Sequence, residues 1–449
     1  MAAQAAITDV RKLFSIESLK NEQIQMIEAI LEKRDVLAVL PTGYGKSLPY
    51  QMYVPLRRKL SGDAYRKQSG MHNKLNEPKV IICSPLLALM GDQVNKLNGV
   101  PEIRHSTNDD DKLRNGQFDY MFGSPELFVG SNEWREMIRE SAIDLIVIDE
   151  FHTIATWGEK ERDGKEAFRK WFGCVGELRS LLPSATVLAL SATCTNQVKR
   201  RVMKALALKP ETLQIAISPN RPNIKLTVER ISKDISFGFS WIVDALSSGT
   251  FPKTLLYCTS INDCSKLYSY LLSELESQSE LIEMYHSETP PTKKEEIIED
   301  LKSENSALKL VIATNALGMG IDIRNCCSAI LFGASFNILD IVQEIGRVGR
   351  DRSPSSALIL FNSNHIGHTS PEVKSFLRER KCYRYALMEF FLNEGELALL
   401  NQEECGKHTC CSFCTQSCKC GKCSNSELEI AFGLQQNLET KSDSESDGD

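Results

Sequence analysis

Short apolar segments recur along the first half of the chain, and each is followed by a turn and then by a segment with helical periodicity. They read RDVLAVL (34–40), KVIICSP (79–85), IDLIVIDE (143–150) and ATVLALSAT (185–193). Their leucine and β-branched residues form nearly continuous apolar runs, which is typical of strands buried on both faces. Alternation of such strands with helices predicts an α/β unit built on a parallel sheet.

A second series of apolar segments follows the break SPNRPNIK (218–225). It comprises KTLLYCTS (253–260), LKLVIATN (308–315) and SAILFGAS (328–335). The same reasoning predicts a second α/β unit that begins near Ser218.

These patterns divide the chain into four predicted parts. They are a first α/β unit at 1–217, a second at 218–362, a helical and then cysteine-rich segment at 363–424, and a tail at 425–449. The tail ends in ETKSDSESDGD, which carries a net charge of −4 out of −6 for the whole chain, and we expect it to be disordered. The nearly neutral remainder does not exclude a basic groove that binds nucleic acid.

The cysteines indicate metal rather than disulfides. No apolar run reaches the roughly 18 residues of a membrane span, and the N-terminus lacks a sustained apolar region. We therefore expect no membrane association and a location in the nucleus or cytosol, where disulfides are rare. Eight of the 15 cysteines fall between Cys382 and Cys423, a density that favours metal ligands.

A candidate phosphate-binding loop lies between the first apolar segment and a helical one. Its nucleotide-binding candidates are Thr42, Gly43, Gly45, Lys46 and Ser47. Glycines let backbone N–H groups close on phosphate oxygens, a lysine reaches the β- and γ-phosphates, and a serine ligates Mg²⁺. Leu40 stands where the strict motif has its first glycine, so a chance glycine turn before a helix is the alternative.

Two adjacent carboxylates, Asp149 and Glu150, end the segment IDLIVIDE. Paired carboxylates at a strand end suit an Mg²⁺ site and a base that activates water. Alone they would be read as a solvated strand end, but a phosphate loop about 100 residues earlier favours an ATPase.

Nine segments carry a family resemblance, in this order: NEQIQMIEAILEKRDVLAVLPTGYGKS, SPLLALMGDQV, SPELF, DEFHTIATWG, SAT, YCTS, YHSE, ATNALGMGID and QEIGRVGRD. With them, the chain from about Phe14 to Cys414 resembles the RecQ family of superfamily 2 helicases. The resemblance implies two RecA-like parallel-sheet lobes followed by a small helical zinc-binding module. It also implies ATP, Mg²⁺ and Zn²⁺ as cofactors.

The resemblance assigns roles in ATP hydrolysis. Gln23 would read adenine, Asp149 would hold Mg²⁺ together with Ser47, and Glu150 would activate water. His152 and the segment 191–193 would couple the nucleotide state to nucleic acid. Phe151 departs from the alanine usual in this box, which puts the coupling in question.

Two arginines near the end of the second unit, Arg347 and Arg350, are implied to complete the site. We expect them on a helix that follows Gly346, where residues three apart share a face. The resemblance implies that both act on the γ-phosphate as the transition state forms. A surface helix with ion pairs is the alternative.

The resemblance also implies one structural zinc, with Cys382, Cys405, Cys411 and Cys414 as ligands. Cys411 and Cys414 keep the C-x-x-C spacing that suits tetrahedral zinc. Cys410 is an alternative to Cys411, and His408 is a competitor. Cys418, Cys420 and Cys423 remain unassigned, and free thiols in a disordered tail are the alternative for the whole group.

The loop that follows the carboxylates is a candidate DNA contact. Trp157 and Phe168 offer faces for base stacking, and Arg169 offers a charge for phosphate. The alternative is that these aromatic side chains pack into the first lobe.

The function implied is an ATP-dependent DNA helicase of 3′–5′ polarity that acts on single-stranded and forked DNA in repair and recombination. Protein partners are not predicted. The residues after 424 are too few for the winged-helix and helical domains that family members often carry, so we expect a short form. The alternatives are a single-strand translocase or annealing factor, and a catalytically weak paralogue that binds nucleic acid.

Overall fold

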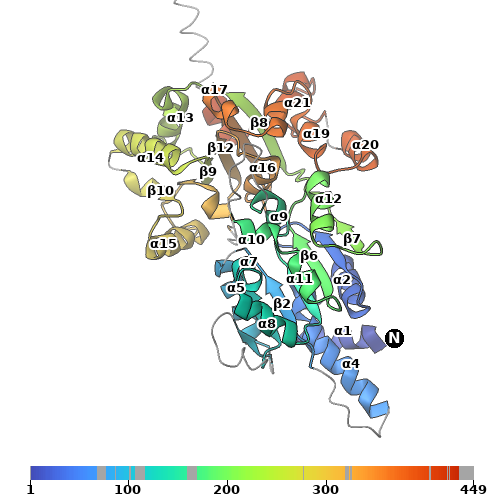
Figure 1. Ribbon diagram of the computed structural model, residues 1–449. Helices are drawn as coiled ribbons and strands as arrows, with labels where there is room; N and C mark the ends of the chain where they lie inside the picture. Colours follow the sequence, from blue (N-terminus) through green and yellow to red (C-terminus); the bar gives the residue numbers. More distant parts are fainter. Residues whose placement is uncertain are drawn as a thin grey trace, which may run out of the picture. The chain divides into compact units, whose positions relative to one another are not determined.

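The computed structural model describes residues 2–433, with gaps at 68–76, 86, 101–102, 107–116, 159–168, 277, 319–322, 324–325, 404–405, 422 and 424. The chain forms two compact units, Met1–Pro219 and Asn220–Asp449, which Figure 1 shows in sequence colours. The division falls two residues after the boundary expected from the sequence. None of the helices within the described ranges has the length and apolar character needed to cross a membrane.

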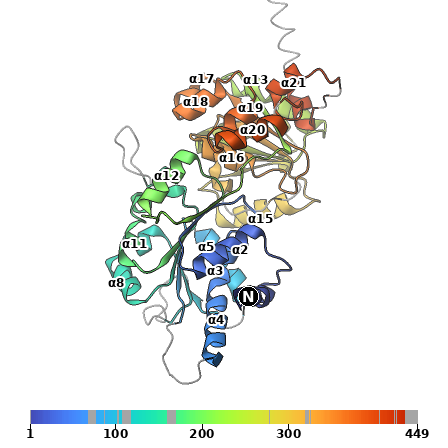
Figure 2. The same ribbon diagram turned by 90° about the vertical axis from the view of Figure 1, so that its right-hand side faces the viewer.

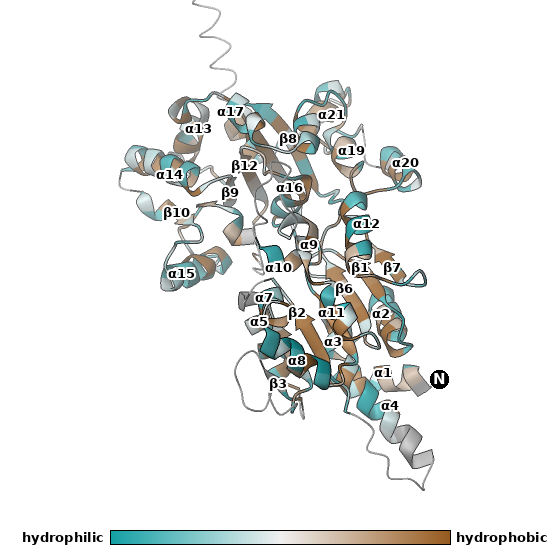
Figure 3. Cartoon of the chain, viewed as in Figure 1, coloured by the Kyte–Doolittle hydropathy of each residue, from teal (hydrophilic) through white to brown (hydrophobic). Residues whose placement is uncertain are grey.

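The first unit contains a seven-stranded parallel sheet of order β3-β4-β2-β5-β6-β1-β7. The strands are β1 (Val36–Val39), β2 (Val80–Cys83), β3 (His105–Ser106), β4 (Tyr120–Gly123), β5 (Leu145–Ile148), β6 (Thr186–Ser191) and β7 (Leu213–Ala216). All four predicted apolar segments are strands of this sheet. Figure 3 shows the hydrophobic character of β2, β6 and β7.

Helices cover both faces of this sheet. They are α1 (Ala2–Leu13), α2 (Asn21–Leu31), α3 (Leu48–Gln51), α4 (Tyr53–Lys67), α5 (Leu87–Asn98), α7 (Pro125–Phe128), α8 (Asn132–Glu140), α9 (Thr153–Thr156), α10 (Lys170–Gly173), α11 (Glu177–Leu181) and α12 (Asn196–Ala205). Figure 2 shows α2 to α5 on one side of the sheet and α8, α11 and α12 on the other. Met26, Ile30 and Tyr53 pack with the strands in one buried core.

The second unit contains a six-stranded parallel sheet of order β10-β11-β9-β12-β13-β8. The strands are β8 (Ile224–Arg230), β9 (Thr254–Cys258), β10 (Ile282–Tyr285), β11 (Leu310–Ala313), β12 (Ser328–Phe332) and β13 (Ser355–Phe361). The helices packed on them are α13 (Ile235–Ser247), α14 (Ile261–Leu275), α15 (Pro291–Lys302) and α16 (Ile338–Ile345), with 3-10 turns η1 (Ser279–Leu281) and η2 (Asn315–Gly318). Two parallel-sheet units confirm the predicted fold class.

The last part of the second unit is helical, as expected, and belongs to the same compact unit as its sheet. Its helices are α17 (Ser363–Gly367), α18 (Pro371–Leu377), α19 (Tyr383–Met388), α20 (Glu394–Glu403) and α21 (Ser412–Ser417). A further helical stretch covers residues 427–433.

That stretch corrects the prediction that residues 425–449 form a disordered tail. Leu428, Ala431 and Phe432 are buried in the core of the second unit, and the Phe432 ring lies edge-on to Trp241 with centroids 5.4 Å apart. These apolar residues have helical spacing, which the acidic composition of the following residues concealed. We call residues 427–433 the anchor helix; residues 434–449 lie outside the described ranges.

Candidate active site and metal centre

The candidate phosphate loop joins β1 to α3 in the first unit. Gly43 and Gly45 have φ angles of +80° and +84°, which glycine adopts without strain. The Tyr44 backbone N–H donates to the Pro41 carbonyl (3.1 Å), and the Leu48 N–H donates to the Gly45 carbonyl (3.2 Å). The loop is therefore a compact turn that leads into a helix, and its exposed residues fit a phosphate ligand.

Gln23 is tied to this loop from α2. Its Nε2 donates to the carbonyls of Tyr44 (3.2 Å) and Gly45 (3.1 Å), and its Oε1 accepts from the Lys20 backbone N–H at 2.9 Å. A Cβ atom at position 45 would lie 2.6 Å from this Nε2. Gln23 is thus in direct contact with the phosphate loop. Its predicted contact with adenine stays a prediction.

Asp149 and Glu150 follow β5 directly. The Asp149 N–H donates to the Cys83 carbonyl at 2.9 Å, and Glu150 has a φ of +50°. A left-handed conformation at a residue other than glycine costs on the order of 1–3 kcal/mol and recurs at functional sites. Phe151 is fully buried, so the unusual aromatic residue of this box fills the core.

A polar network connects Glu150 to the end of β6. The His152 Nδ1 lies 2.9 Å from the Ser191 Oγ and 3.3 Å from the Glu150 Oε2. The Ala192 N–H donates to the same Glu150 oxygen at 3.4 Å, and the Ser191 hydroxyl donates to the Thr193 carbonyl at 2.8 Å. Segments about 40 residues apart therefore share one hydrogen-bonded network.

The two carboxyls titrate in opposite directions. Burial, reinforced by the charge of Glu150, raises the pKa of Asp149 well above its ordinary value. Burial also acts to raise the pKa of Glu150, but the charge of Lys46 and the hydrogen bond with His152 outweigh it and lower that pKa. Glu150 is thus ionised at neutral pH, the state needed to accept a proton from water.

The loop after the carboxylates is closed at its base by a clamp that the sequence did not reveal. The guanidinium of Arg169 donates from Nε and Nη2 to the two carboxylate oxygens of Glu126 (2.8 and 2.6 Å), and from Nη1 to the Pro85 carbonyl (2.7 Å). Trp157 lies edge-on to Phe172 with centroids 5.4 Å apart, and Arg169 stacks over the Phe172 ring at 4.5 Å.

This clamp corrects the assignment of Arg169 to a DNA phosphate, because its guanidinium is engaged within the first unit. Trp157 keeps partial exposure, and Phe168 lies outside the described residues. The clamp depends on a bidentate ion pair between Glu126 and Arg169. A pair of residues 43 positions apart cannot be recognised from a single sequence.

Arg347 and Arg350 lie in a turn and not on a helix, which corrects the expectation above. Helix α16 ends at Ile345 with Gly346 as its cap, and Gly349 has a φ of +56°. The Gly349 carbonyl accepts from Asn223 Nδ2 at 2.9 Å and from the guanidinium of Arg221. Sequence reasoning missed this support: both residues lie in the segment taken as a domain break.

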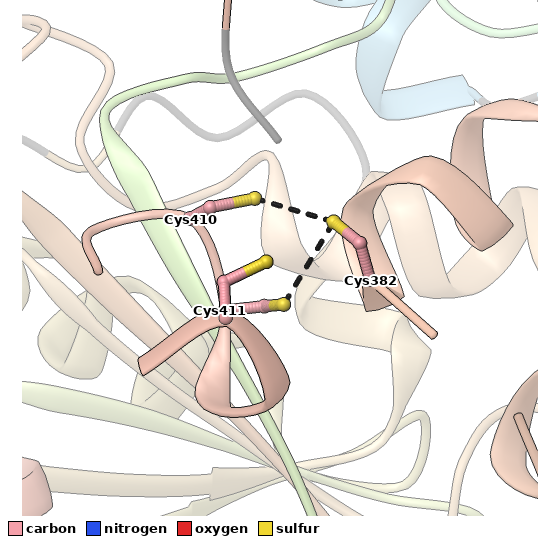
Figure 4. Close-up of side chains that lie close together, drawn as sticks. Cys382, Cys410 and Cys411 are labelled. Carbon is pink, nitrogen blue, oxygen red and sulfur yellow. Dashed lines mark hydrogen bonds between the residues drawn. The ribbon is translucent and has the colours of Figure 1, made fainter. Parts of the chain in front are cut away.

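Four cysteines converge at the candidate metal centre of the second unit: Cys382, Cys410, Cys411 and Cys414. We call them the first cysteine group. Their sulfur atoms lie within 4.8 Å of one another; Cys382 Sγ is 3.5 Å from that of Cys410 and 3.9 Å from that of Cys411 (Figure 4). A zinc tetrahedron with four sulfur ligands has edges of about 3.8 Å, so the group fits zinc.

The first cysteine group contains three of the four ligands implied by the resemblance. Cys410 and Cys411 are both members, where the sequence offered them as alternatives. Cys405 lies outside the described residues. The backbone N–H of Gly406 donates to the Cys414 sulfur at 3.4 Å, a contact that supports a metal-bound thiolate.

Arg384 fixes this centre to the sheet of the second unit. Its side chain is 2% exposed, and its guanidinium donates to Asn220 Oδ1 (2.8 Å) and to the backbone carbonyls of Arg221 (2.9 Å), Ile224 and Cys410 (3.1 Å). No sequence motif indicated these acceptors.

The second unit also contains a cavity of about 670 Å³ at the carboxyl ends of β9 and β12. Lys233, Lys266 and the N-terminal end of α14 line it, and Phe336 at its rim is 62% exposed. Glu344 also lines it and accepts a hydrogen bond from the Ser335 hydroxyl at 2.6 Å. Burial raises the pKa of Glu344 to about 8.

Comparison with known proteins agrees with this arrangement. The DEAD/DEAH box helicase model matches residues 20–201, and the helicase conserved C-terminal domain model matches residues 238–352. The chain is 26% identical over 429 residues to the ATP-dependent DNA helicase RecQ of Haemophilus influenzae, covering 89% of this chain and 63% of that protein. It is 30% identical over 358 residues to the probable ATP-dependent DNA helicase RecS of Bacillus subtilis, covering 78% and 65%.

A solved structure of the DUF1998 helicase MrfA bound to DNA superposes with a TM-score of 0.58 at 17% identity, covering 82% of this chain and 52% of that one. This likeness supports the fold. The chain thus spans slightly less than two thirds of the two curated relatives described above.

Proposed function

The chain belongs to the RecQ family of superfamily 2 helicases, and from this premise we propose that it couples nucleic-acid-dependent ATP hydrolysis to the unwinding of DNA. The observation that carries the proposal is the network of Glu150, His152 and Ser191 beside Lys46. It supports the proposal because Glu150, whose charge interacts with that of Lys46, is connected through this network to a second loop.

The first unit supplies the groups that the reaction needs. Lys46 and the backbone of the phosphate loop bind the phosphates, and Glu150 accepts the proton of the attacking water. Ser47 and Asp149 are the oxygen donors that would hold Mg²⁺, which when bound neutralises phosphate charge. His152 transmits changes at Glu150 to Ser191, since it contacts both.

The second unit supplies the arginines. Arg347 and Arg350 lie in a turn held by Arg221 and Asn223, so their positions are set by the scaffold of that unit. We assign them to the developing charge on the γ-phosphate, as in other phosphoryl-transfer enzymes.

DNA binding is proposed for the cavity of the second unit. Lys233, Lys266 and the N-terminal end of α14 offer N–H donors for phosphate in a cavity that Asp263, Asp340 and Glu344 also line. Phe336 provides an exposed ring on which a base stacks. Base stacking does not depend on sequence, which suits an enzyme that moves along a strand.

Polarity and pathway belong to the same proposal. We propose 3′–5′ movement on single-stranded DNA, action at forks, and a role in repair and recombination in the nucleus, on the strength of the family resemblance. The relatives' own names describe DNA helicases.

Unwinding assays with matched substrates test the proposal. Duplexes with a 3′ tail, a 5′ tail or a fork are compared, alongside ATPase assays stimulated by single-stranded DNA or RNA. We expect unwinding of the 3′-tailed and forked substrates and stimulation by DNA, both lost in Lys46→Ala. ATPase activity stimulated by RNA but not by DNA would refute DNA as the substrate. ATPase activity stimulated by DNA without unwinding of any duplex would instead establish a translocase.

A further inference from the structure

A second set of metal donors lies beside the first cysteine group: His408, Cys418, Cys420 and Cys423. We call it the second donor group. None of its members belongs to the first group, and one ligand atom from each lies within 4.8 Å of every other. We propose that the second donor group binds a second zinc ion, independent of the first, in a three-cysteine, one-histidine site.

The distances match a tetrahedral zinc site. Zn–S and Zn–N bonds of about 2.3 and 2.0–2.1 Å give donor–donor edges of about 3.5–3.8 Å. The Nδ1 of His408 lies 3.8 Å from the Cys418 sulfur and 3.2 Å from the Cys420 sulfur. Cys420 and Cys423 sulfurs are 3.5 Å apart. Four soft and borderline donors at these separations suit zinc over Mg²⁺ or Ca²⁺, which take oxygen ligands.

The local backbone is arranged for this convergence. Cys420 and Cys423 form a C-x-x-C pair, and Gly421 between them has a φ of +65°, so the chain turns where other residues would be strained. The Thr415 hydroxyl donates to the His408 carbonyl at 2.7 Å. That bond fixes His408, which comes from a separate segment, against α21, whose end leads to Cys418.

The charge of an occupied site is also balanced. Three thiolates and a neutral imidazole around Zn²⁺ leave one net negative charge. Lys407, Lys419 and Lys422 lie next to the ligands in the sequence, and their charge offsets that of the occupied site. A Cys420–Cys423 disulfide would use only two of the donors and would leave His408 and Cys418 without a role.

The site has a structural consequence. The chain leaves the first cysteine group at Cys414, passes through the second donor group, and enters the anchor helix, where Glu429 pairs with Lys225 at 3.0 Å. Only this short segment connects the two fixed ends. A second zinc therefore orders the path by which the anchor helix reaches the core of the second unit.

Metal content of the full chain tests the proposal. After passage over a chelating resin, elemental analysis should find two zinc ions per chain in the natural protein and in the control Cys174→Ser. Cys420→Ser/Cys423→Ser should retain one. X-ray absorption should give seven sulfur ligands to one nitrogen across the two zincs of the natural protein, and four sulfurs without nitrogen in the double variant.

A structural readout accompanies the metal count. Trypsin cleaves after lysine, and Lys419 lies between two proposed ligands, so the double variant should be cut there faster than the control. One zinc per natural chain, or a spectrum without nitrogen, would overturn the proposal even if the double variant failed to fold. A disulfide in the freshly purified protein, found by thiol counting, would also overturn it.

Discussion

Replacing Arg384 by methionine should detach the first cysteine group from the sheet of the second unit. Methionine keeps much of the side-chain volume but donates no hydrogen bond. The natural guanidinium donates to four oxygen acceptors, one of which is the carbonyl of Cys410. The variant leaves these acceptors without their donor in a region where Arg384 itself is 2% exposed.

The size of the effect follows from burial. Hydrogen bonds to a charged group contribute about 1.5–3 kcal/mol each, but they are not additive. Breaking a buried charged network by removing one partner costs about 3–5 kcal/mol. We therefore expect Arg384→Met to lower the free energy of unfolding of the second unit by about 3–5 kcal/mol.

Release of zinc from the first cysteine group measures this loss of stability at the metal centre. A metallochromic chelator is added to the protein at increasing urea concentrations, and the midpoint of zinc release is compared with that of Arg380→Met. Arg380 is an exposed arginine on the same segment, so its variant controls for the loss of charge. The Arg384 variant should release zinc at a clearly lower urea concentration. Equal midpoints for the two variants would show that the four hydrogen bonds do not hold the metal centre in place.

Four further outcomes are expected. Arg350→Ala should bind ATP but hydrolyse it about a thousandfold more slowly, as for loss of an arginine finger; turnover near the natural rate would refute this role. Phe336→Ala should weaken binding of single-stranded DNA by about 5- to 150-fold, corresponding to about 1–3 kcal/mol of stacking, whereas the exposed-residue control Leu399→Ala should not. Trp157→Ala should keep basal ATPase activity and lose its stimulation by single-stranded DNA; normal stimulation would make the ring structural. Because the pKa of Glu344 is raised to about 8, the folded protein retains a proton that the unfolded chain loses near pH 4.5, so the contribution of Glu344 to the free energy of unfolding falls as pH rises between these values. Glu344→Gln should therefore stabilise the protein by an amount that grows from near zero at pH 4.5 to a few kcal/mol at pH 8. A stability difference that does not change with pH would contradict this expectation.

Most of the central strands were predictable because their residues are almost all apolar. All seven apolar segments identified in the sequence are strands, and strands such as β1 and β5 are fully buried along their length. The edge strands β3, β7, β8 and β10 were not identified, nor were the interior strands β4 and β13. β7 has only one buried residue among four, and β10 is buried only at its two ends. A half-exposed strand of four residues has too few apolar positions to stand out from a loop.

The site was predictable where the chemistry depends on adjacent residues, and not where it depends on the scaffold. The phosphate loop, the carboxylate pair and the C-x-x-C spacing are each local in sequence. The turn that carries Arg347 was expected to be helical, but α16 ends at Ile345. The Gly349 carbonyl in this turn accepts from Asn223, more than 100 residues earlier, and such a contact is not visible in a local motif.

The arginines show that a sequence motif identifies a positive charge more reliably than it identifies what that charge contacts. Arg169 was expected to contact a DNA phosphate, yet its guanidinium, like that of Arg384, is engaged within its own unit. The acceptors lie 84 and 160 residues away in the sequence. Each arginine joins a segment beside a candidate functional site to the sheet of its own unit: Arg169 closes the base of the loop after the carboxylates, and Arg384 holds the first cysteine group. Because a forked, permanently charged donor satisfies several buried carbonyls at once, the same property that suits arginine to phosphate suits it to this internal use. The free energy of such a clamp keeps the neighbouring site in position, so its loss should affect the chemistry without any change in the catalytic groups.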